Sequence, residues 1–184
     1  MKKSIPFLNE ILQVMVLIAL GHLMVACGNK DQSVPPPIRD DISPEESAIA
    51  REALVDWLEC EECTENQLES VLQYSENIQP MLIGALIEGV APASRELYKR
   101  ELEKRYDELE EYATNHPHSK PALPKQEFVD LYLGNLRAQY QTRAAQALAM
   151  IGGDDANRAL QDALRESDRE DVRIVITQAL DEMK

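Results

Sequence analysis

Apolar positions between residues 43 and 184 recur every three or four residues, which is the spacing of one face of an α-helix. No stretch alternates β-branched and polar residues with a period of two, as a half-buried strand would. Helix formers are plentiful, whereas the chain has only seven Gly and two Phe. The pattern therefore predicts an all-α fold of about seven helices, joined mostly by short turns between antiparallel neighbours.

Capping signals place the first three helices. Residues 43–46 (Ser-Pro-Glu-Glu) form a capping box with proline at the first helical position, and residues 64–67 repeat the capping pattern. Pro80 is expected in the first turn of a third helix, which Gly89 and Pro92 end. The apolar face predicted for the first helix consists of Ile49, Ala53, Leu54, Trp57 and Leu58.

Two long helices follow, over residues 94–115 and about 125–151, separated by a His- and Pro-containing loop. The first is highly charged and has only a narrow apolar stripe, so it should pack on one neighbour and leave most of its surface in water. Tyrosines recur along both helices. They are interpreted either as seam residues between the two helices or as a surface that binds a partner. The candidates for that surface are Tyr98, Tyr106, Tyr132 and Tyr140.

The C-terminal region predicts two shorter helices. Gly152 and Gly153 end the second long helix, and Asp154 is expected to cap the next one. Residues 167–170 (Ser-Asp-Arg-Glu) form a third capping box, which should start the last helix.

Residues 72–86 and 148–164 share a helix–turn–helix pattern of apolar positions. Residues 143–180, with a run of Ala, the turn Gly-Gly-Asp-Asp at 152–155 and Asp171-Val172-Arg173, resemble bacterial HEAT-like repeats of the type also found in phycobiliprotein lyases, and residues 65–89 resemble them less closely. The resemblance implies a short α-solenoid with the long charged helix inserted between repeats. Most proteins of this kind bind other proteins, so the resemblance is specific for the fold and uninformative about a reaction.

The N-terminal region has the pattern of an export signal. Lys2 and Lys3 precede an apolar run over residues 11–26, which ends at Ala26, Cys27 and Gly28. Basic start, apolar run, small residue and cysteine together resemble the lipobox of a bacterial lipoprotein signal peptide, rather than a plain secretory signal or an uncleaved membrane anchor. The resemblance implies cleavage before Cys27 and lipidation of Cys27, with palmitate among the possible acyl chains. Because Asp after the lipidated cysteine would resemble an inner-membrane retention signal, the resemblance with Gly28 in that position implies the outer membrane, with the protein facing the periplasm.

This reading divides the chain into a signal peptide (1–26), a lipidated cysteine with a tether (27–42) and a HEAT-like helical domain (43–184). Pro35-Pro36-Pro37 and the polar residues before them are typical of an extended tether. Loss of residues 1–26 changes the net charge from −14 to −15, because Lys2, Lys3 and Glu10 are removed. So acidic a chain argues against nucleic acid and anionic lipid surfaces as partners.

Cys60 and Cys63 form the only cysteine pair that remains once Cys27 is assigned to lipid. A short structural disulfide suits an exported protein. Free thiols, a redox motif and half of a metal site are the alternatives, but neighbouring glutamates disfavour a thiolate and no second cysteine pair exists. His116 and His118 flank Pro117 in the loop and are interpreted as solvated residues rather than metal ligands.

No nucleophile motif, phosphate-binding loop or zinc-protease pattern occurs in the sequence. We therefore expect a non-enzymatic envelope lipoprotein that binds an unidentified protein partner as a scaffold or assembly factor, without a cofactor or metal. The alternatives are a thiol–disulfide or metal-handling protein that uses Cys60 and Cys63, and a lyase- or chaperone-like HEAT protein.

Overall fold

The structure is a computed structural model that describes residues 43–60 and 62–184. These residues are all helical, without a strand, which confirms the predicted all-α class. Their elements are α2 (Pro44–Glu59), α3 (Glu65–Leu72), α4 (Ser75–Glu88), α5 (Pro92–Asn115), the short 3-10 helix η2 (Pro117–Ser119), α6 (Lys125–Ile151), α7 (Asp154–Glu166) and α8 (Glu170–Glu182).

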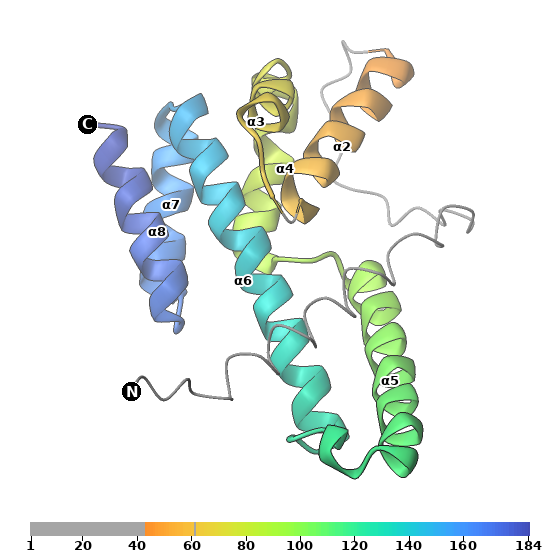
Figure 1. Ribbon diagram of the computed structural model, residues 1–184. Coiled ribbons are helices and arrows are strands. Elements are labelled where there is room, and N and C mark those ends of the chain that lie inside the picture. Colours follow the sequence, from red (N-terminus) through yellow and green to blue (C-terminus); the bar gives the residue numbers. More distant parts are fainter. Residues whose placement is uncertain (1–42, 61) are drawn as a thin grey trace, which may run out of the picture. The chain divides into compact units, whose positions relative to one another are not determined.

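Helix α6 is the central element, because it contacts each of the other six α-helices described. Figure 1 shows α5 alongside the first half of α6, and α4, α7 and α8 around its second half. We call α5, η2 and residues 125–136 the arm, and α2, α3, α4, α7, α8 and residues 137–151 the core. Apart from η2, the backbone of α5 comes close only to α6.

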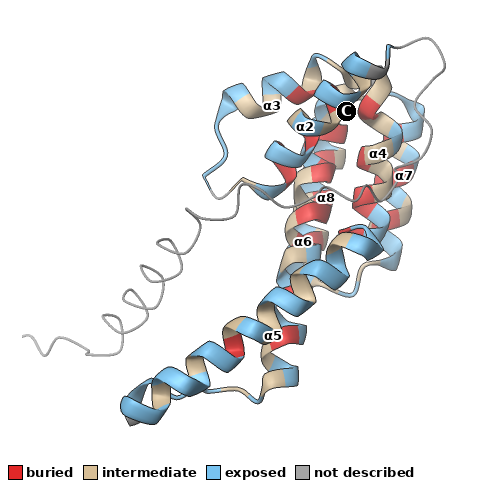
Figure 2. Ribbon diagram, turned by 90° about the vertical axis from the view of Figure 1, so that its right-hand side faces the viewer, coloured by how far each residue is buried: buried red, intermediate tan, exposed pale blue. Residues whose placement is uncertain are grey.

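The core is built from leucine, isoleucine and valine of the outer helices packed against small residues of α6 (Figure 2). Four alanines of α6 are buried and let the neighbouring helices approach closely: Ala138, Ala144, Ala145 and Ala147. Fully buried side chains from α4, α6, α7 and α8 fill the space around them: Ile78, Leu82, Leu86, Leu148, Leu160, Val172 and Ile176. Burial of each such side chain stabilises the fold by about 1.5–3 kcal/mol.

Both predicted N-terminal capping boxes are confirmed. The backbone N–H of Glu46 donates to Ser43 Oγ (3.2 Å), and the carboxylate of Glu46 accepts from the backbone N–H of Ser43 (3.2 Å). At the start of α3, Gln67 Oε1 accepts from the backbone N–H of Thr64 (2.9 Å). Each box satisfies backbone groups that have no partner within their own helix.

The predicted start of the third helix at Pro80 is wrong, since α4 begins at Ser75 and contains Pro80 in its interior. A proline there removes one backbone hydrogen bond and costs about 3 kcal/mol. Ile78, Leu82 and Leu86 repeat every four residues on the other side of the helix and are fully buried. Their combined burial outweighs the cost of the exposed Pro80.

Three other predicted helix starts are also corrected. The first long helix is predicted to begin at residue 94, but α5 begins at Pro92. A proline at the first helical position is harmless, because the backbone N–H there has no partner within the helix. Asp154 is already helical, because positive φ angles at Gly152 and Gly153 reverse the chain and make Gly153 the N-cap of α7. Ser167 does not cap α8, whose N-cap is Arg169.

The buried face of α2 also differs slightly from the predicted one. Ile49 is exposed, and Ala50 occupies the core instead. Among the described helices, the backbone of α2 comes close only to α3, α4 and α6, so its buried face is narrow and is formed by Ala50, Leu54, Trp57 and Leu58.

Candidate functional site

The C-terminus of α2 is fixed by two polar side chains of α6. Arg143 donates to the carbonyl oxygens of Leu58 (Nη1, 2.8 Å), Trp57 (Nη1, 3.3 Å) and Cys60 (Nη2). Gln139 Nε2 donates to the Leu58 carbonyl (3.0 Å) as well. The last turn of α2 contains no basic residue of its own, so these groups satisfy carbonyls at the negative end of the helix from outside.

Helix α2 also donates a hydrogen bond to α6. The indole N–H of Trp57 donates to the Arg143 carbonyl (3.2 Å), and the Trp57 ring belongs to the core. Burial lowers the pKa of the Arg143 guanidinium, which nevertheless stays charged at neutral pH. Removal of this side chain would therefore take the Arg143 donor away from the carbonyls of Trp57 and Cys60, while the Leu58 carbonyl would still accept from Gln139.

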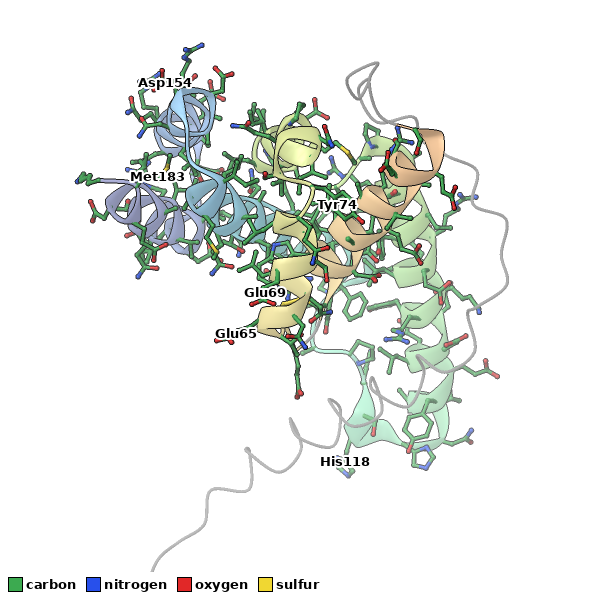
Figure 3. All side chains as sticks on the ribbon, turned by 90° about the horizontal axis from the view of Figure 1, so that it is seen from above. Glu65, Glu69, Tyr74, His118, Asp154 and Met183 are labelled. Atoms are coloured by element: carbon green, nitrogen blue, oxygen red, sulfur yellow. A yellow bond between two sulfur atoms is a disulfide. The ribbon has the colours of Figure 1, made fainter. Side chains whose placement is uncertain are left out.

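The Cys60–Cys63 pair lies directly after this anchored helix end. Its sulfur atoms are 1.99 Å apart and its Cα atoms 5.3 Å apart, so the two residues form a disulfide across the turn between α2 and α3. Cys60 is partly buried, and Cys63 is exposed. Figure 3 shows Glu65 and Glu69 projecting from α3 beyond this turn, and both side chains are exposed.

Two of the four candidate tyrosines meet next to the same helix end. The hydroxyl of Tyr140 on α6 donates to Glu59 Oε1 (2.5 Å), at the last residue of α2. Burial raises the pKa of Tyr140, and the hydrogen bond to and charge of Glu59 raise it further. Burial and Glu59 likewise raise the pKa of Tyr98 on α5. The cluster joins α2, α5 and α6, with both phenols held in their neutral form.

The other two candidate tyrosines lie in the arm. The ring of Tyr106 packs against Phe128 (centroids 5.4 Å apart), and its hydroxyl donates to the Leu123 carbonyl (2.9 Å). The ring of Tyr132 also packs against Phe128 (centroids 4.5 Å apart). Tyr106 and Tyr140 are only 6% and 7% exposed, whereas Tyr132 is 40% exposed. In this conformation Tyr132 is thus the most accessible of these three to a partner.

A shallow, open hollow of about 370 Å³ lies between α6 and the start of α8. Five of the residues that line it come from α6 and two from the turn into α8: Asn135, Ala138, Gln139, Thr142, Arg143, Arg169 and Asp171. Arg169 forms a bidentate ion pair with Asp171 (3.0 and 2.7 Å) and also donates to Asn135 Oδ1 (3.3 Å). The pair raises the pKa of Arg169 and lowers that of Asp171.

The loop between α5 and α6 carries His116 and His118. Figure 3 labels His118 at the tip of the arm. The His116 ring stacks on Tyr112 (centroids 4.1 Å apart), and its Nδ1 lies 3.1 Å from the Tyr112 carbonyl oxygen. His118 is exposed. Within residues 43–60 and 62–184, no three potential ligands of the His, Cys, Asp or Glu type come close enough to hold a metal ion.

Arg143, Gln139 and Glu59 are the residues that the sequence did not single out. They are far apart from their partners along the chain, and none belongs to a recognisable motif. One indirect signal existed, since α2 ends without a glycine or a basic residue and therefore needs a cap from elsewhere.

Cys27, its signal peptide and the Pro-rich tether lie outside the described residues. Among the described helices, none has both the length and the apolar character needed to span a membrane. In comparisons with known proteins, the chain matches no family model, no curated protein and no solved structure.

Proposed function

We propose that the protein is a non-enzymatic lipoprotein of the bacterial envelope, anchored through Cys27, whose helical domain binds a protein partner as a scaffold or assembly factor. The lipobox resemblance at residues 24–28 supports the anchor, and the Cys60–Cys63 disulfide is compatible with an oxidising compartment. The Pro-rich segment 35–37 would separate the helical domain from the outer membrane, on its periplasmic side.

The domain is proposed to be a short HEAT-like solenoid. Support comes from the consecutive packing of α6, α7 and α8, which cover residues 143–180. Arg173, in the segment that carries the resemblance, donates to the carbonyls of Leu164 (2.6 Å) and Ser167 (3.3 Å) and so fixes the α7–α8 turn. In this reading, α5 is the charged insertion between repeats.

The observation that carries the binding proposal is the outer face of α6. Leu131 and Tyr132 are 48% and 40% exposed, and Asn135 follows one turn later at the edge of the polar hollow. Apolar and aromatic side chains beside a polar, hydrogen-bonding rim are typical of protein-binding surfaces. The surface we propose includes Tyr132, one of the predicted partner residues.

The proposal is tested by site-specific crosslinking in envelope preparations. A photo-crosslinking residue at Tyr132 should give a reproducible covalent adduct with one protein, identified by mass spectrometry, and the same residue at the exposed Val55 of α2 should not. Leu131→Asp with Tyr132→Asp should remove the adduct formed through a crosslinker at Asn135. Absence of a specific adduct would reject the binding role. The mass of the mature chain reports separately whether Cys27 carries lipid.

A thiol–disulfide role is the second candidate, because Cys63 is exposed at the surface and within reach of another thiol. The double substitution Cys60→Ser with Cys63→Ser separates the two functions. A redox protein would lose its activity and keep its fold, whereas a scaffold would keep its crosslinked partner and lose some stability.

A further inference from the structure

The charges of α5 are divided along its length. Residues 92–105 carry five basic and three acidic side chains, whereas residues 106–115 carry four acidic and no basic ones. The exposed outer face follows the same division. Arg100 and Lys104 occupy its first part, and Glu108 and Glu111 its second part.

This division opposes the dipole of the helix itself. The N-terminus of a helix favours acidic side chains and the C-terminus basic ones. Helices α2, α3, α6, α7 and α8 all carry an acidic residue in the first turn, but α5 has no acidic residue in its first turn and no basic one in its last. The order of charges in α5 is therefore unfavourable with respect to the helix dipole, and within the helix the exposed Lys104 and Glu108 form an i,i+4 ion pair (3.7 Å).

Within the described part of the chain, no other helix covers the outer face of α5, where Lys104 and Glu108 pair only with each other. The backbone of α5 approaches only α6 and η2, and its opposite side faces solvent. Two large apolar side chains lie at the two ends of that side: Leu97 is 62% exposed and Tyr112 is 50% exposed. Positions 97, 100, 104, 108, 111 and 115 follow one another at three- or four-residue spacing and so form one ridge.

We propose that this ridge of α5 binds the same ridge of a second copy of the chain, with the two helices antiparallel. A two-fold axis near residue 106 would bring Lys104 of one copy opposite Glu108 of the other, and Arg100 opposite Glu111. The symmetry forms each of these pairs twice. Leu97 of each copy would meet the end of the partner helix near Asn115, beside the ring of Tyr112.

The net negative charge of the chain makes it possible to distinguish the proposed contact from a non-specific association by its dependence on salt. Two copies with a net charge of −14 repel each other, so added salt should favour a non-specific association by screening that repulsion. The proposed contact behaves in the opposite way, because salt weakens exposed ion pairs. It is independent of the lipid anchor and of the α6 surface proposed above.

Photo-crosslinking of the full chain purified in detergent tests the proposal. A photo-crosslinking residue at Leu97 should give a covalent dimer, with the link located by mass spectrometry in residues 108–116 of the second copy. The same residue at the exposed Ile174 of α8 is the matched control and should not link to that segment. The yield at Leu97 should fall at least several-fold when salt is raised from about 0.1 M to about 1 M, which shortens the Debye length from about 10 Å to about 3 Å.

Charge reversal provides the decisive comparison. Arg100→Glu with Lys104→Glu, and separately Glu108→Lys with Glu111→Lys, should each reduce dimer yield at least tenfold. A mixture of these two variants, and a chain carrying all four changes, should restore it because the charges are complementary again. Circular dichroism melting checks that each variant keeps its helices. Failure of the mixture to restore the dimer, or a yield that rises with salt, would overturn the proposal.

Discussion

The core and the arm contain the same kind of secondary structure but are held together differently. In the core, α6 is surrounded by several helices, its alanines are buried, and its polar side chains bond to the ends of α2 and α4. In the arm, α5 lies alongside α6 and is joined to it by aromatic contacts and by the Lys125–Asp107 ion pair, while Arg169 reaches Asn135 at the base of the arm. The comparison indicates that the core provides most of the stability, whereas most residues of α5 in the arm are exposed to solvent.

The largest expected difference between the two regions comes from leucine truncation. Leu148→Ala removes a fully buried side chain from the centre of α6 and should lower the free energy of unfolding by about 3–5 kcal/mol, because a cavity remains. Leu131→Ala, in the half-exposed part of α6, should change it by less than about 1 kcal/mol. Urea unfolding followed by circular dichroism measures both. Equal losses in the free energy of unfolding for the two variants would contradict the proposed difference in packing between the arm and the core.

The next effect concerns the anchoring of α2 in the core. Arg143→Met keeps the aliphatic part of the side chain but leaves the carbonyls of Trp57 and Cys60 without the Arg143 donor, and the Leu58 carbonyl with Gln139 as its remaining side-chain donor. We expect a loss of about 2–4 kcal/mol. Arg165→Met is the control, because Arg165 forms only an exposed ion pair with Asp162, worth at most about 1 kcal/mol. Crosslinking at Tyr132 would show whether the proposed binding surface survives.

The disulfide should contribute less, since it closes a very short loop. Cys60→Ser with Cys63→Ser should lower the free energy of unfolding by about 2 kcal/mol, through the greater freedom of the unfolded chain. Thermal melting with and without a reducing agent measures the same contribution in the unmodified protein. A reductant that leaves its melting temperature unchanged would contradict a structural role for the bond.

The smallest expected effect is a pH dependence of stability, which arises from the tyrosines beside Glu59 where the core meets the base of the arm. A free tyrosine has a pKa of about 10, and burial beside Glu59 raises the pKa of both Tyr98 and Tyr140 in the folded state. Above pH 10 the unfolded chain therefore loses protons that the folded chain keeps, so stability should fall as the pH rises. Each tyrosine adds a slope of up to about 1.4 kcal/mol per pH unit.

Tyr140→Phe isolates the contribution of one phenol. The variant should lose about 1 kcal/mol at pH 8, because the hydrogen bond to Glu59 is removed. Its stability should nevertheless decline less steeply than that of the unmodified protein between pH 10 and pH 11. Urea unfolding at several pH values gives both quantities, and identical slopes for the two proteins would exclude Tyr140 as the titrating group.

Local features of the chain were predictable because they depend on neighbours in sequence. The spacing of apolar residues predicted the helical class, and the boundaries of α6 at Lys125 and Ile151 agree with the structure. The capping boxes at Ser43 and Thr64 were found because their donors and acceptors lie three residues apart. The pairing of Cys60 with Cys63 is equally local.

Tertiary structure decided the features that depend on distant residues. Pro80 lies inside α4 because Ile78, Leu82 and Leu86 are buried against other helices. Arg143 is the cap of α2 although more than eighty residues separate them, and the candidate tyrosines divide into a buried cluster at Glu59 and an aromatic row in the arm. Sequence spacing determines which side chains share a helix face. Only the packing of helices determines which faces meet, and therefore which of these side chains remain free to bind a partner.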